Sequence, residues 1–554
     1  MLRRLGVFAD GFTLAAAEVV GAAGLVDGTE VLDLLARLVD RSLVVAEDGG
    51  ARYRLLETIA AYALERLDEA GEAGQSRLRH AHWYADLAEH ADQQLRGHGQ
   101  QQWLERLDIE SANSRAALTY AVGQSVAQSD PALALRLAGA LAWYWFLRGR
   151  HSEGRRLLAM ALAATALPTG SQVPVAARAR ALAGLAGLGS HDRTSTDTAE
   201  HGRAALALYA GLEDPAGLAR ALWLVGLVMV DGREPSSGIR LVADALTGFR
   251  RLGDRWGVAA ALSIRGWEHM RRGELPDAQR DGEESWSLFV EVGDRWGQVR
   301  SADLLGVLAE IEGDYEQATA LHTDGLRLAE ELGLWPVVTQ QLGRLGRLAV
   351  LAADYPAALA LHERALQLAR EQAFERGVSF ARTGLGLIAR RQGQLESAES
   401  QLTEVLDAHR VAGFHPGTAF VAAELGFVAE LRGDAEAARA WHLEGLRSAR
   451  VSGDPRAIAL ALEGLAGADA LAGRHDRAGW LLGSADAARR SVDRPLPPAE
   501  RTDVDRISAV LRAALGEAGF DKAWHRGASA GLDAVLATLD VEPRSATHTR
   551  RTAT

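Results

Sequence analysis

The sequence predicts an all-α solenoid, a superhelix of stacked helical hairpins, behind a small amino-terminal module. Two series of small residues carry this prediction, because both step along the chain with a period of 40 residues. The first series holds helix-internal glycines: Gly226, Gly266, Gly306, Gly346, Gly386 and Gly426. The second holds alanines in phase with them: Ala278, Ala318, Ala358, Ala398, Ala438 and Ala478. A chain that reuses one supersecondary unit at such a period is a solenoid, since each unit needs its neighbours to bury its apolar face.

One unit, residues 301–333, shows what is repeated. Two apolar stripes at helical spacing flank a short turn at Gly313-Asp314-Tyr315, which predicts a helical hairpin. Glycine is about 1 kcal/mol less favourable than alanine inside a helix, so its recurrence indicates a close contact between helices. We therefore expect Gly306 and Ala318 to lie where the two helices approach most closely.

Residues 1–60 predict a different module. In chain order they predict a short strand at Val7–Phe12, a helix at Leu14–Ala22, a second helix at Glu30–Asp40, and two strands around a turn at Asp48-Gly49-Gly50. A helix-helix-hairpin order of this kind is typical of a winged helix.

The rest of the chain divides into four predicted segments. A helical linker covers 61–129, with three long helical segments between Thr58 and Val122. The repeat array covers 130–492 in about nine units, the first two of them irregular. A helical cap follows at 493–540, with two helices ending near Leu539, and the polar residues 541–554 predict a disordered tail.

Composition excludes several functions. The formal net charge of −12 argues against a large nucleic-acid-binding surface, although it allows a small basic patch. The absence of cysteine excludes disulfides, thiolate nucleophiles and cysteine metal sites. No apolar run reaches the roughly 18–20 residues that span a bilayer, and MLRRLGVFADGF lacks the pattern of a secretory signal. We therefore expect a soluble, cytoplasmic protein without a membrane partner.

Motifs for nucleotide binding and hydrolysis are weak. Lys522 is the only lysine and lies outside any Walker A loop, which excludes nucleotide hydrolysis by the P-loop route. Gly384-Leu385-Gly386 imitates a dinucleotide fingerprint, but it has the phase of the repeats and predicts helix packing. Gly527-Ala528-Ser529-Ala530-Gly531 matches the GxSxG nucleophile elbow, yet its surroundings predict a helical cap instead of the strand that the elbow needs. We expect no cofactor and no catalytic residue.

Two groups of histidines are candidate metal ligands: His80, His82 and His90, and then His322, His362 and His442. Residues two apart on a helix point about 200 degrees apart, so the first group cannot share an ion with ordinary geometry. The second group recurs with the repeats, and stacked repeats hold such side chains farther apart than the roughly 4 Å of a shared site. Both groups are predicted to be structural or surface residues, with no metal bound.

The best candidate for a binding site is the concave face of the solenoid. In the register set by Gly306, eleven first-helix positions face this groove: Trp223, Trp267, Arg300, Asp303, Gln340, Arg347, Phe380, Arg390, Phe420, Phe427 and Glu430. A groove with aromatic anchors and arginines suits a peptide or a small effector. Packing between repeats is the alternative explanation for each of these residues.

Four arginines lie on the surfaces that a winged helix offers to DNA, the second helix and the wing: Arg37, Arg41, Arg52 and Arg54. They predict contacts either to DNA or to another domain. Sequence-specific DNA binding also needs base-reading side chains and commonly a dimer, and neither is evident in the sequence.

The repeat unit resembles the tetratricopeptide repeat. Leu305-Gly306 matches the leucine-glycine pair of its first helix, and Ala318 matches the alanine of its second helix. The unit departs from the pattern in its length of about 40 residues and in Ala302, which replaces the first-helix tryptophan. His322, His362 or the pair Trp441-His442 stands where the second-helix aromatic residue is usual.

Several stretches together resemble the carboxy-terminal half of large actinobacterial regulators of the signal-transduction ATPase (STAND) class, including the LuxR-type ones. The stretches are RRLGVFADGFTLAAAEVV, VLDLLARLVDRSLVV, YRLLETIAAYALERLDEAGE and RAGWLLGSADAARRSVDRPLPPAER. In that family a nucleotide-binding module precedes the winged helix, the repeats sense an inducer or partner, and a LuxR-type helix-turn-helix commonly follows. This sequence lacks both flanking domains, so we expect neither ATP switching nor promoter binding through such a helix-turn-helix.

The sequence and the resemblance together predict a regulatory sensor scaffold that is not an enzyme. Its repeat groove is expected to bind a protein partner, a peptide or a small inducer as part of a STAND-type transcriptional regulatory system. A separate nucleotide-binding STAND protein is a second candidate partner. The alternative is a transcriptional regulator that binds DNA through the amino-terminal winged helix.

Overall fold

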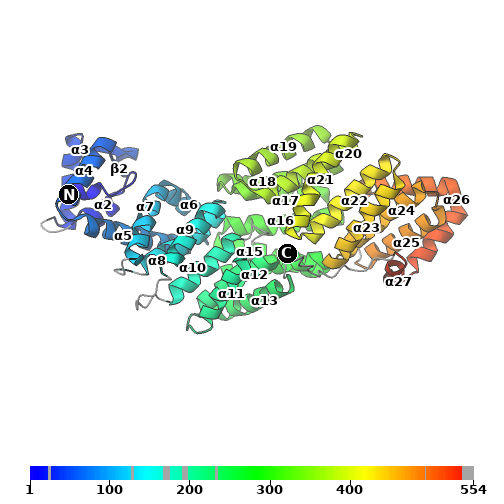
Figure 1. Ribbon diagram of the computed structural model, residues 1–554, viewed down its shortest axis with the longest axis horizontal. Coiled ribbons are helices and arrows are strands. Elements are labelled where there is room, and N and C mark those ends of the chain that lie inside the picture. The colour runs from blue at the N-terminus through cyan, green and yellow to red at the C-terminus, as the bar shows by residue number, and fades with distance from the viewer. Residues whose placement is uncertain are drawn as a thin grey trace, which may run out of the picture. The chain divides into compact units, whose positions relative to one another are not determined.

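The computed structural model describes residues 1–22, 26–126, 130, 132–165, 175–189, 197–230, 235–492 and 495–539. The predicted disordered tail, 541–554, lies outside the described residues. The chain forms two compact units (Figure 1). The first comprises Met1–Val258 and Phe289–Arg295, and the second comprises Ala259–Leu288 and Trp296–Thr554.

The first unit begins with helices around a two-stranded antiparallel sheet. Its elements are α1 (Leu2–Leu5), α2 (Leu14–Gly21), η1 (Gly28–Glu30), α3 (Val31–Asp40), β1 (Val44–Glu47), η2 (Asp48–Gly50), β2 (Arg52–Leu55) and α4 (Glu57–Glu69). The Thr13 hydroxyl accepts a hydrogen bond from the Ala16 backbone and starts α2. Gly49 has a φ of 67°, the left-handed conformation that lets the chain turn back between the strands.

The strand predicted at Val7–Phe12 is wrong. Only Phe12 pairs, through two backbone hydrogen bonds with Tyr53 of 2.8 and 2.9 Å. The apolar side chains of this stretch are buried by ring packing instead of a ladder, since Phe8 and Phe12 stack with their ring centroids 4.6 Å apart. An alternating apolar pattern this short therefore did not distinguish a strand from a packed loop.

Four helices, where three were predicted, connect this module to the repeats: α4 is followed by α5 (Ala73–Gln94), α6 (Gln100–Ile109) and α7 (Ser111–Val126). The extra break falls at Glu110, within a stretch that the sequence predicted as one helix. Glu110 is buried and its carboxylate accepts hydrogen bonds from Tyr84, Arg52 and Asn113 at 2.7, 2.5 and 3.0 Å. These buried contacts fix the chain at the corner between α6 and α7.

The repeats follow as successive helical hairpins. The described pairs are α8 (Leu133–Leu147) with α9 (His151–Ala164), α10 (Val175–Leu188) with α11 (Asp197–Tyr209), α12 (Pro215–Val230) with α13 (Pro235–Leu252), α14 (Arg255–Arg271) with α15 (Leu275–Val292), α16 (Arg295–Glu312) with α17 (Tyr315–Glu331), α18 (Trp335–Leu351) with α19 (Tyr355–Glu371), α20 (Glu375–Arg391) with α21 (Leu395–Ala412), α22 (His415–Leu431) with α23 (Ala435–Ser452), and α24 (Pro455–Leu471) with α25 (His475–Arg490). Figure 1 shows the later pairs of the second unit stacked in order. The fold is an all-α solenoid of tetratricopeptide-like repeats with a small winged-helix module at its amino terminus.

The repeated glycines lie where the sequence predicted. A Cβ atom on Gly306 would lie 2.6 Å from His322, and one on Gly346 would lie 2.6 Å from His362, in each case on the second helix of the same hairpin. The alanines of the second series, Ala318 among them, are fully buried. His322, His362 and His442 are therefore core residues of their hairpins, with 0, 1 and 0 percent of their surface exposed.

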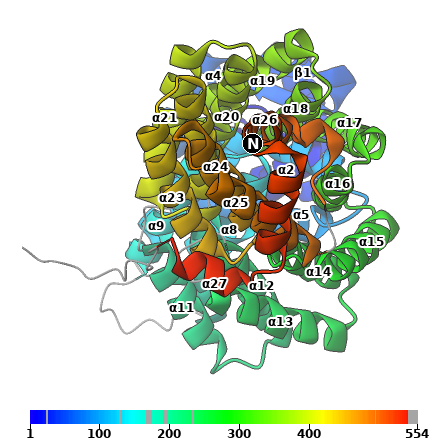
Figure 2. The ribbon, with the colours of Figure 1, turned by 90° about the vertical axis from the view of Figure 1, so that its right-hand side faces the viewer.

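The chain closes with η4 (Pro498–Glu500), α26 (Thr502–Ala528) and α27 (Leu532–Ala537), and α26 lies beside α25 (Figure 2). The GxSxG match falls at the end of α26, so a helix and not a strand leads into it. Gly527 packs against the backbone of Trp480, so this motif serves helix packing. Gly384 and Gly386 likewise lie inside α20. Within the described part of the chain, no helix is long and apolar enough to cross a membrane.

Candidate functional site

One cavity of the second unit lies in the groove formed by the first helices of its repeats. Its volume is about 330 Å³. Side chains from α14, α16, α18, α20, α22 and α24 line it, and residues 495–504 form one further wall. Since first helices supply most of the lining, the cavity lies on the concave face that the repeat pattern predicted as a binding surface.

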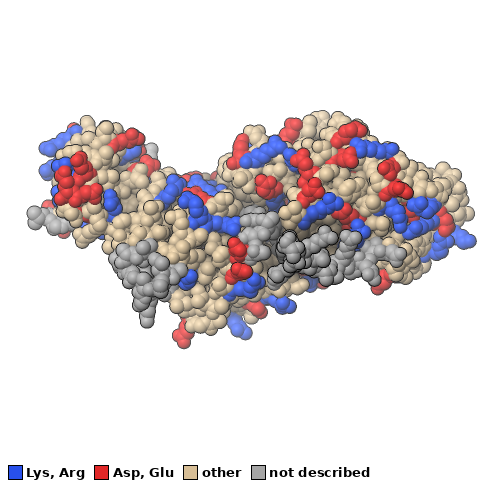
Figure 3. Space-filling model, in the orientation of Figure 1, with Lys and Arg blue, Asp and Glu red and all other residues tan. Residues whose placement is uncertain are grey.

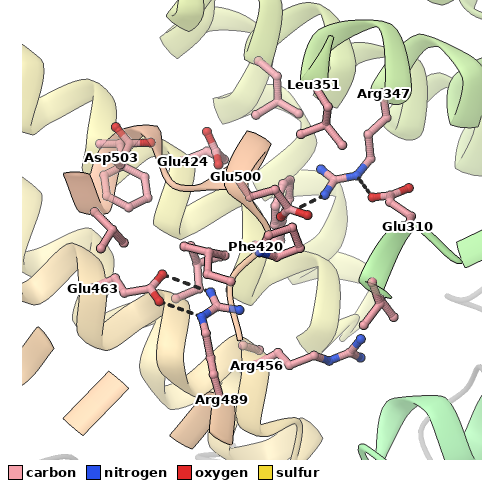
Figure 4. Close-up of a pocket in the computed structure, with 18 of the residues that line it drawn as sticks. Glu310, Arg347, Leu351, Phe420, Glu424, Arg456, Glu463, Arg489, Glu500 and Asp503 are labelled. Atoms are coloured by element: carbon pink, nitrogen blue, oxygen red, sulfur yellow. Dashed lines mark hydrogen bonds and ion pairs between the residues drawn. The ribbon is translucent and has the colours of Figure 1, made fainter. Parts of the chain in front are cut away.

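Arginine and carboxylate pairs cross this cavity. Arg347 contacts Glu310 and, at 3.4 Å, Glu500 (Figure 4). Arg489 donates two hydrogen bonds of 2.7 and 3.0 Å to Glu463. The pair of Arg347 and Glu310 joins two successive repeats, whereas the pair of Arg489 and Glu463 joins the two helices of the last hairpin.

Arg390 is the centre of a more deeply buried cluster of charges, and its own side chain is 3 percent exposed. Its guanidinium lies 2.8 Å from Glu424 and 2.9 Å from Asp503. Burial raises the pKa of the Glu424 carboxyl. Burial by itself would also raise the pKa of Asp503, but the nearby Arg390 outweighs it and the pKa is lowered. Arg390 therefore holds Asp503 as a carboxylate.

One cation of the cavity is uncommitted. Arg391 is half-buried in the lining and makes no ion pair or hydrogen bond with any residue that the structure describes. Its charge favours the ionised forms of Glu424 and Asp503, and its guanidinium can donate hydrogen bonds to a carboxylate or phosphate of a ligand without breaking an internal pair.

Aromatic side chains lie next to these charged groups. Phe420 lies in the centre of the view in Figure 4, and Phe427 is 2 percent exposed with its ring 5.2 Å from the guanidinium carbon of Arg390. The cavity thus combines arginines with aromatic faces, a surface suited to a ligand that has both acidic and apolar groups.

The structure brings together four of the eleven predicted groove residues in this cavity: Arg347, Arg390, Phe420 and Phe427. Glu430 lies beside them and pairs with Arg506 of α26 at 2.6 Å. Burial raises the pKa of Glu430 although Arg506 opposes this shift.

Four more predicted residues gather around Arg344, which the sequence reasoning missed: Trp267, Asp303, Gln340 and Phe380. Arg344 lies 3.1 Å from the carboxylate of Asp303, and its guanidinium carbon is 5.7 and 5.3 Å from the rings of Trp267 and Phe380. Its position one helical turn after Gln340 on α18 was the signal that could have revealed it. Arg300 lies apart from this group, over the ring of Trp296.

Trp223 belongs to the first unit, whereas the other ten predicted groove residues belong to the second. Its ring centroid is 5.7 Å from that of Trp143 and 5.1 Å from that of Trp256. The three tryptophans line a smaller cavity of about 220 Å³ together with Arg96, whose guanidinium stacks on Trp143 and Trp256. Trp223 is therefore not grouped with the other predicted residues.

The sequence analysis also missed the carboxylates that line the cavity: Glu310, Glu424, Glu463, Glu500 and Asp503. The last two belong to a stretch that the sequence predicted only as a turn and a helix start. Each pairs with an arginine 26 to 153 residues away, which leaves no local sequence signal.

Of the four arginines in the amino-terminal module, two are tied to other residues. Arg52 donates to Glu110 at 2.5 Å and to the Gly11 carbonyl at 2.7 Å, and Arg54 pairs with Glu47 at 2.8 Å. Arg37 and Arg41 are exposed. On the face drawn in Figure 3, basic and acidic side chains alternate over the surface.

The three histidines of the first group have different partners and do not share a site. His80 is buried beside Asn113, His82 pairs with Asp130 at 3.3 Å, and His90 packs on Trp103. Among the described residues, one set has the spacing of metal ligands: His269, Glu274 and Asp277. His269 and Glu274 already contact each other at 2.5 Å, and the set is largely exposed.

Comparisons with known proteins agree with this architecture. Residues 1–68 match the family model of a winged helix-turn-helix domain, and residues 377–450 match that of the tetratricopeptide repeat. Over 290 residues, 51 percent of this chain, the sequence is 36 percent identical to a Mycobacterium tuberculosis protein that has the provisional name of an HTH-type transcriptional regulator. The alignment covers 32 percent of that protein, so this chain spans about a third of its length.

A second, uncharacterized protein of Mycobacterium tuberculosis is 49 percent identical over 76 residues, which are 13 percent of this chain and 19 percent of that protein. Among solved structures, a STAND protein with a tetratricopeptide repeat sensor from Pyrococcus horikoshii is 14 percent identical with a TM-score of 0.46, and the match covers 82 percent of this chain and 62 percent of that one. Aspartyl phosphate phosphatase F from Bacillus subtilis is 13 percent identical with a TM-score of 0.39, covering 67 and 94 percent. Tetratricopeptide-like repeats with a winged helix thus define the class of this chain.

Proposed function

We propose that this chain is a regulatory scaffold without catalytic activity, which binds a protein partner or a small inducer in the groove of its second unit. The observation that carries the proposal is the cavity of about 330 Å³, in which arginines and aromatic rings from successive repeats converge. Concave surfaces of this kind serve binding in repeat proteins.

The proposed biological setting is a STAND-type transcriptional regulatory system. The winged helix-turn-helix match at residues 1–68 and the 36 percent identity to a protein named as an HTH-type regulator support this setting. A ligand in the groove can act by favouring one conformation of the repeats over another, and only to the extent of its difference in affinity for the two.

Direct DNA binding by the winged helix is less well supported. Arg52 already pairs with Glu110 and Arg54 with Glu47, which leaves the exposed Arg37 and Arg41 as the predicted arginines that are available to phosphates. In the alternative, charge reversal at Arg37 and Arg41 would abolish retention of DNA fragments.

Affinity capture from the native cells, with matched variants, tests the proposal. Arg391→Gln removes the uncommitted charge of the cavity, and Arg370→Gln removes an exposed charge on α19 as the control. Loss of one charge-assisted hydrogen bond of roughly 1.4 kcal/mol corresponds to about tenfold weaker binding. A stoichiometric partner that is retained about tenfold less by Arg391→Gln, and normally by Arg370→Gln, supports the groove. Equal retention by both variants contradicts it, and so does specific DNA without any protein.

A further inference from the structure

The connection that leads into α26 is unlike the others of the second unit. Two or three residues join each second helix to the next first helix, as in Leu332–Leu334 or Gly453–Asp454. Eleven residues separate Arg490 at the end of α25 from Thr502 at the start of α26. This longer connection enters the groove, because Pro495, Leu496, Pro497 and Glu500 line the cavity.

The path of this connection follows the repeats in order. Val492 lies against Gly273, and Pro497 lies against Gly313, one repeat further. Beyond them, three polar contacts join the chain to α18, α20 and α22 in turn: Glu500 with Arg347 at 3.4 Å, Asp503 with Arg390 at 2.9 Å, and Arg506 with Glu430 at 2.6 Å. We call residues 495–506 the groove segment.

The spacing of these contacts has a geometric reason. The groove segment advances three residues for each repeat between Glu500 and Arg506. Glu500 ends the 3-10 helix η4, and Asp503 and Arg506 lie in the first turns of α26, where residues three apart lie on the same face of the helix. The segment begins in extended form, with Pro497 at φ −60° and ψ 150°. Proline-rich chain of this kind has little conformational freedom to lose when it is bound.

The groove segment supplies carboxylates that balance the arginines of the cavity. Its lining holds six arginines and six acidic residues, and two of the acidic residues, Glu500 and Asp503, belong to the groove segment. Without them the groove walls have two more arginines than carboxylates. Arg390 is almost completely buried, and a buried charge that loses a partner is strongly unfavourable, so the emptied groove would favour another pair of carboxylates.

We propose that the groove segment is an intramolecular ligand, and that it occupies the site of an acidic peptide from a partner protein, which enters the groove in extended form and turns into a helix, with two carboxylates three residues apart. This inference rests on the proposed function and specifies the ligand. A ligand tethered by a short linker is present at an effective concentration on the order of millimolar. The partner peptide must displace the segment, so the affinity of the segment for the groove sets the peptide concentration that binding requires.

The test uses the full chain and a fluorescent peptide with the sequence of residues 495–506. The double variant Glu500→Gln, Asp503→Asn weakens the intramolecular ligand and leaves the groove walls intact. It should bind the peptide at least about tenfold more tightly than the wild-type chain does, because the internal competitor is weaker. A control peptide with the same two amide substitutions should not bind either chain.

A reversible lock provides a second readout, because its oxidised and reduced forms are the same protein and differ only in the bond. The chain has no cysteine, and a Cβ on Gly313 would lie 3.6 Å from that of Pro497, within the usual span of a disulfide. The variant Gly313→Cys, Pro497→Cys should form this bond, lose peptide binding when oxidised, and return to the wild-type level when reduced.

Three results overturn the inference. Equal peptide affinity of the wild-type chain and the double variant shows that the segment does not compete, and so does equal affinity of the oxidised and reduced lock. No binding to any form up to millimolar peptide shows that the segment is no mimic of a ligand. A wild-type dimer that dissociates in the double variant identifies a second copy as the occupant. In each case the Arg391→Gln capture still decides the proposed function separately.

Discussion

Replacement of His362 by leucine should make the second unit less sensitive to acid. The imidazole is 1 percent exposed and lies against two helix backbones, because Gly346 of α18 and Gly384 of α20 leave room for it. Neither ring nitrogen has a hydrogen-bond partner among the described residues. Burial lowers the pKa of His362 from its ordinary 6.5 to about 4.

The sign and size of the effect follow from this pKa. Between pH 7.5 and 5.0 the unfolded chain takes up a proton at this histidine and the folded chain does not, so the folded state loses stability as the pH falls. With the two pKa values of 6.5 and about 4, the loss at pH 5.0 is about 2 kcal/mol. His442, whose pKa burial lowers to about 3, adds a similar amount in the wild-type chain and in the variant alike.

Urea unfolding at pH 7.5 and 5.0, followed by circular dichroism, measures this difference. The free energy of unfolding should fall about 2 kcal/mol less in His362→Leu than in the wild-type chain. His415→Leu, at an exposed position of α22, reports any effect of removing a surface imidazole. The same pH dependence in wild type and His362→Leu would refute the reasoning, since it would mean that water or a proton reaches the ring in the folded state.

Three further substitutions test the packing and the ion pairs. Gly384→Ala places a methyl group against the ring of His362 and should destabilise the chain by about 1–3 kcal/mol in urea unfolding. Its control, Gly123→Ala, lies on an open helical surface and should stabilise the chain by about 1 kcal/mol. The same sign for both variants would contradict the packing account. Arg390→Leu leaves the buried Glu424 without its ion-pair partner and Asp503 with Arg506 alone, so it should cost about 3–5 kcal/mol. A change below about 1 kcal/mol would show that water screens the pairs. Arg52→Met removes the cation of a buried glutamate and should lower the melting temperature of the first unit, which calorimetry can follow; an unchanged transition would show that this pair is not structural.

The repeats were predictable because their signal is local and recurs. Gly306 and Ala318 each belong to a series of six residues that step by 40, and the close packing at these positions repeats with the fold. Stretches that do not repeat carry a weaker signal for prediction. The break at Glu110 depends on Arg52 and Tyr84, which lie 58 and 26 residues away, and no pattern within the stretch announces these contacts.

The candidate site was predictable only in part, for a related reason. Helical register identifies which side chains face a groove, and it placed Arg347 and Phe420 there. Register says nothing about a connection that enters the groove from the far end of the array. Glu500 and Asp503 were missed because their partners lie 153 and 113 residues away.

The most direct test of the account is competition for the captured partner. The double variant Glu500→Gln, Asp503→Asn is loaded with that partner, and the peptide of residues 495–506 is then added at increasing concentration. The account predicts that the peptide releases the partner, and that the peptide with both carboxylates replaced by amides does not. A partner that stays bound at saturating peptide would show that it binds elsewhere, and would contradict the assignment of the groove as the binding site.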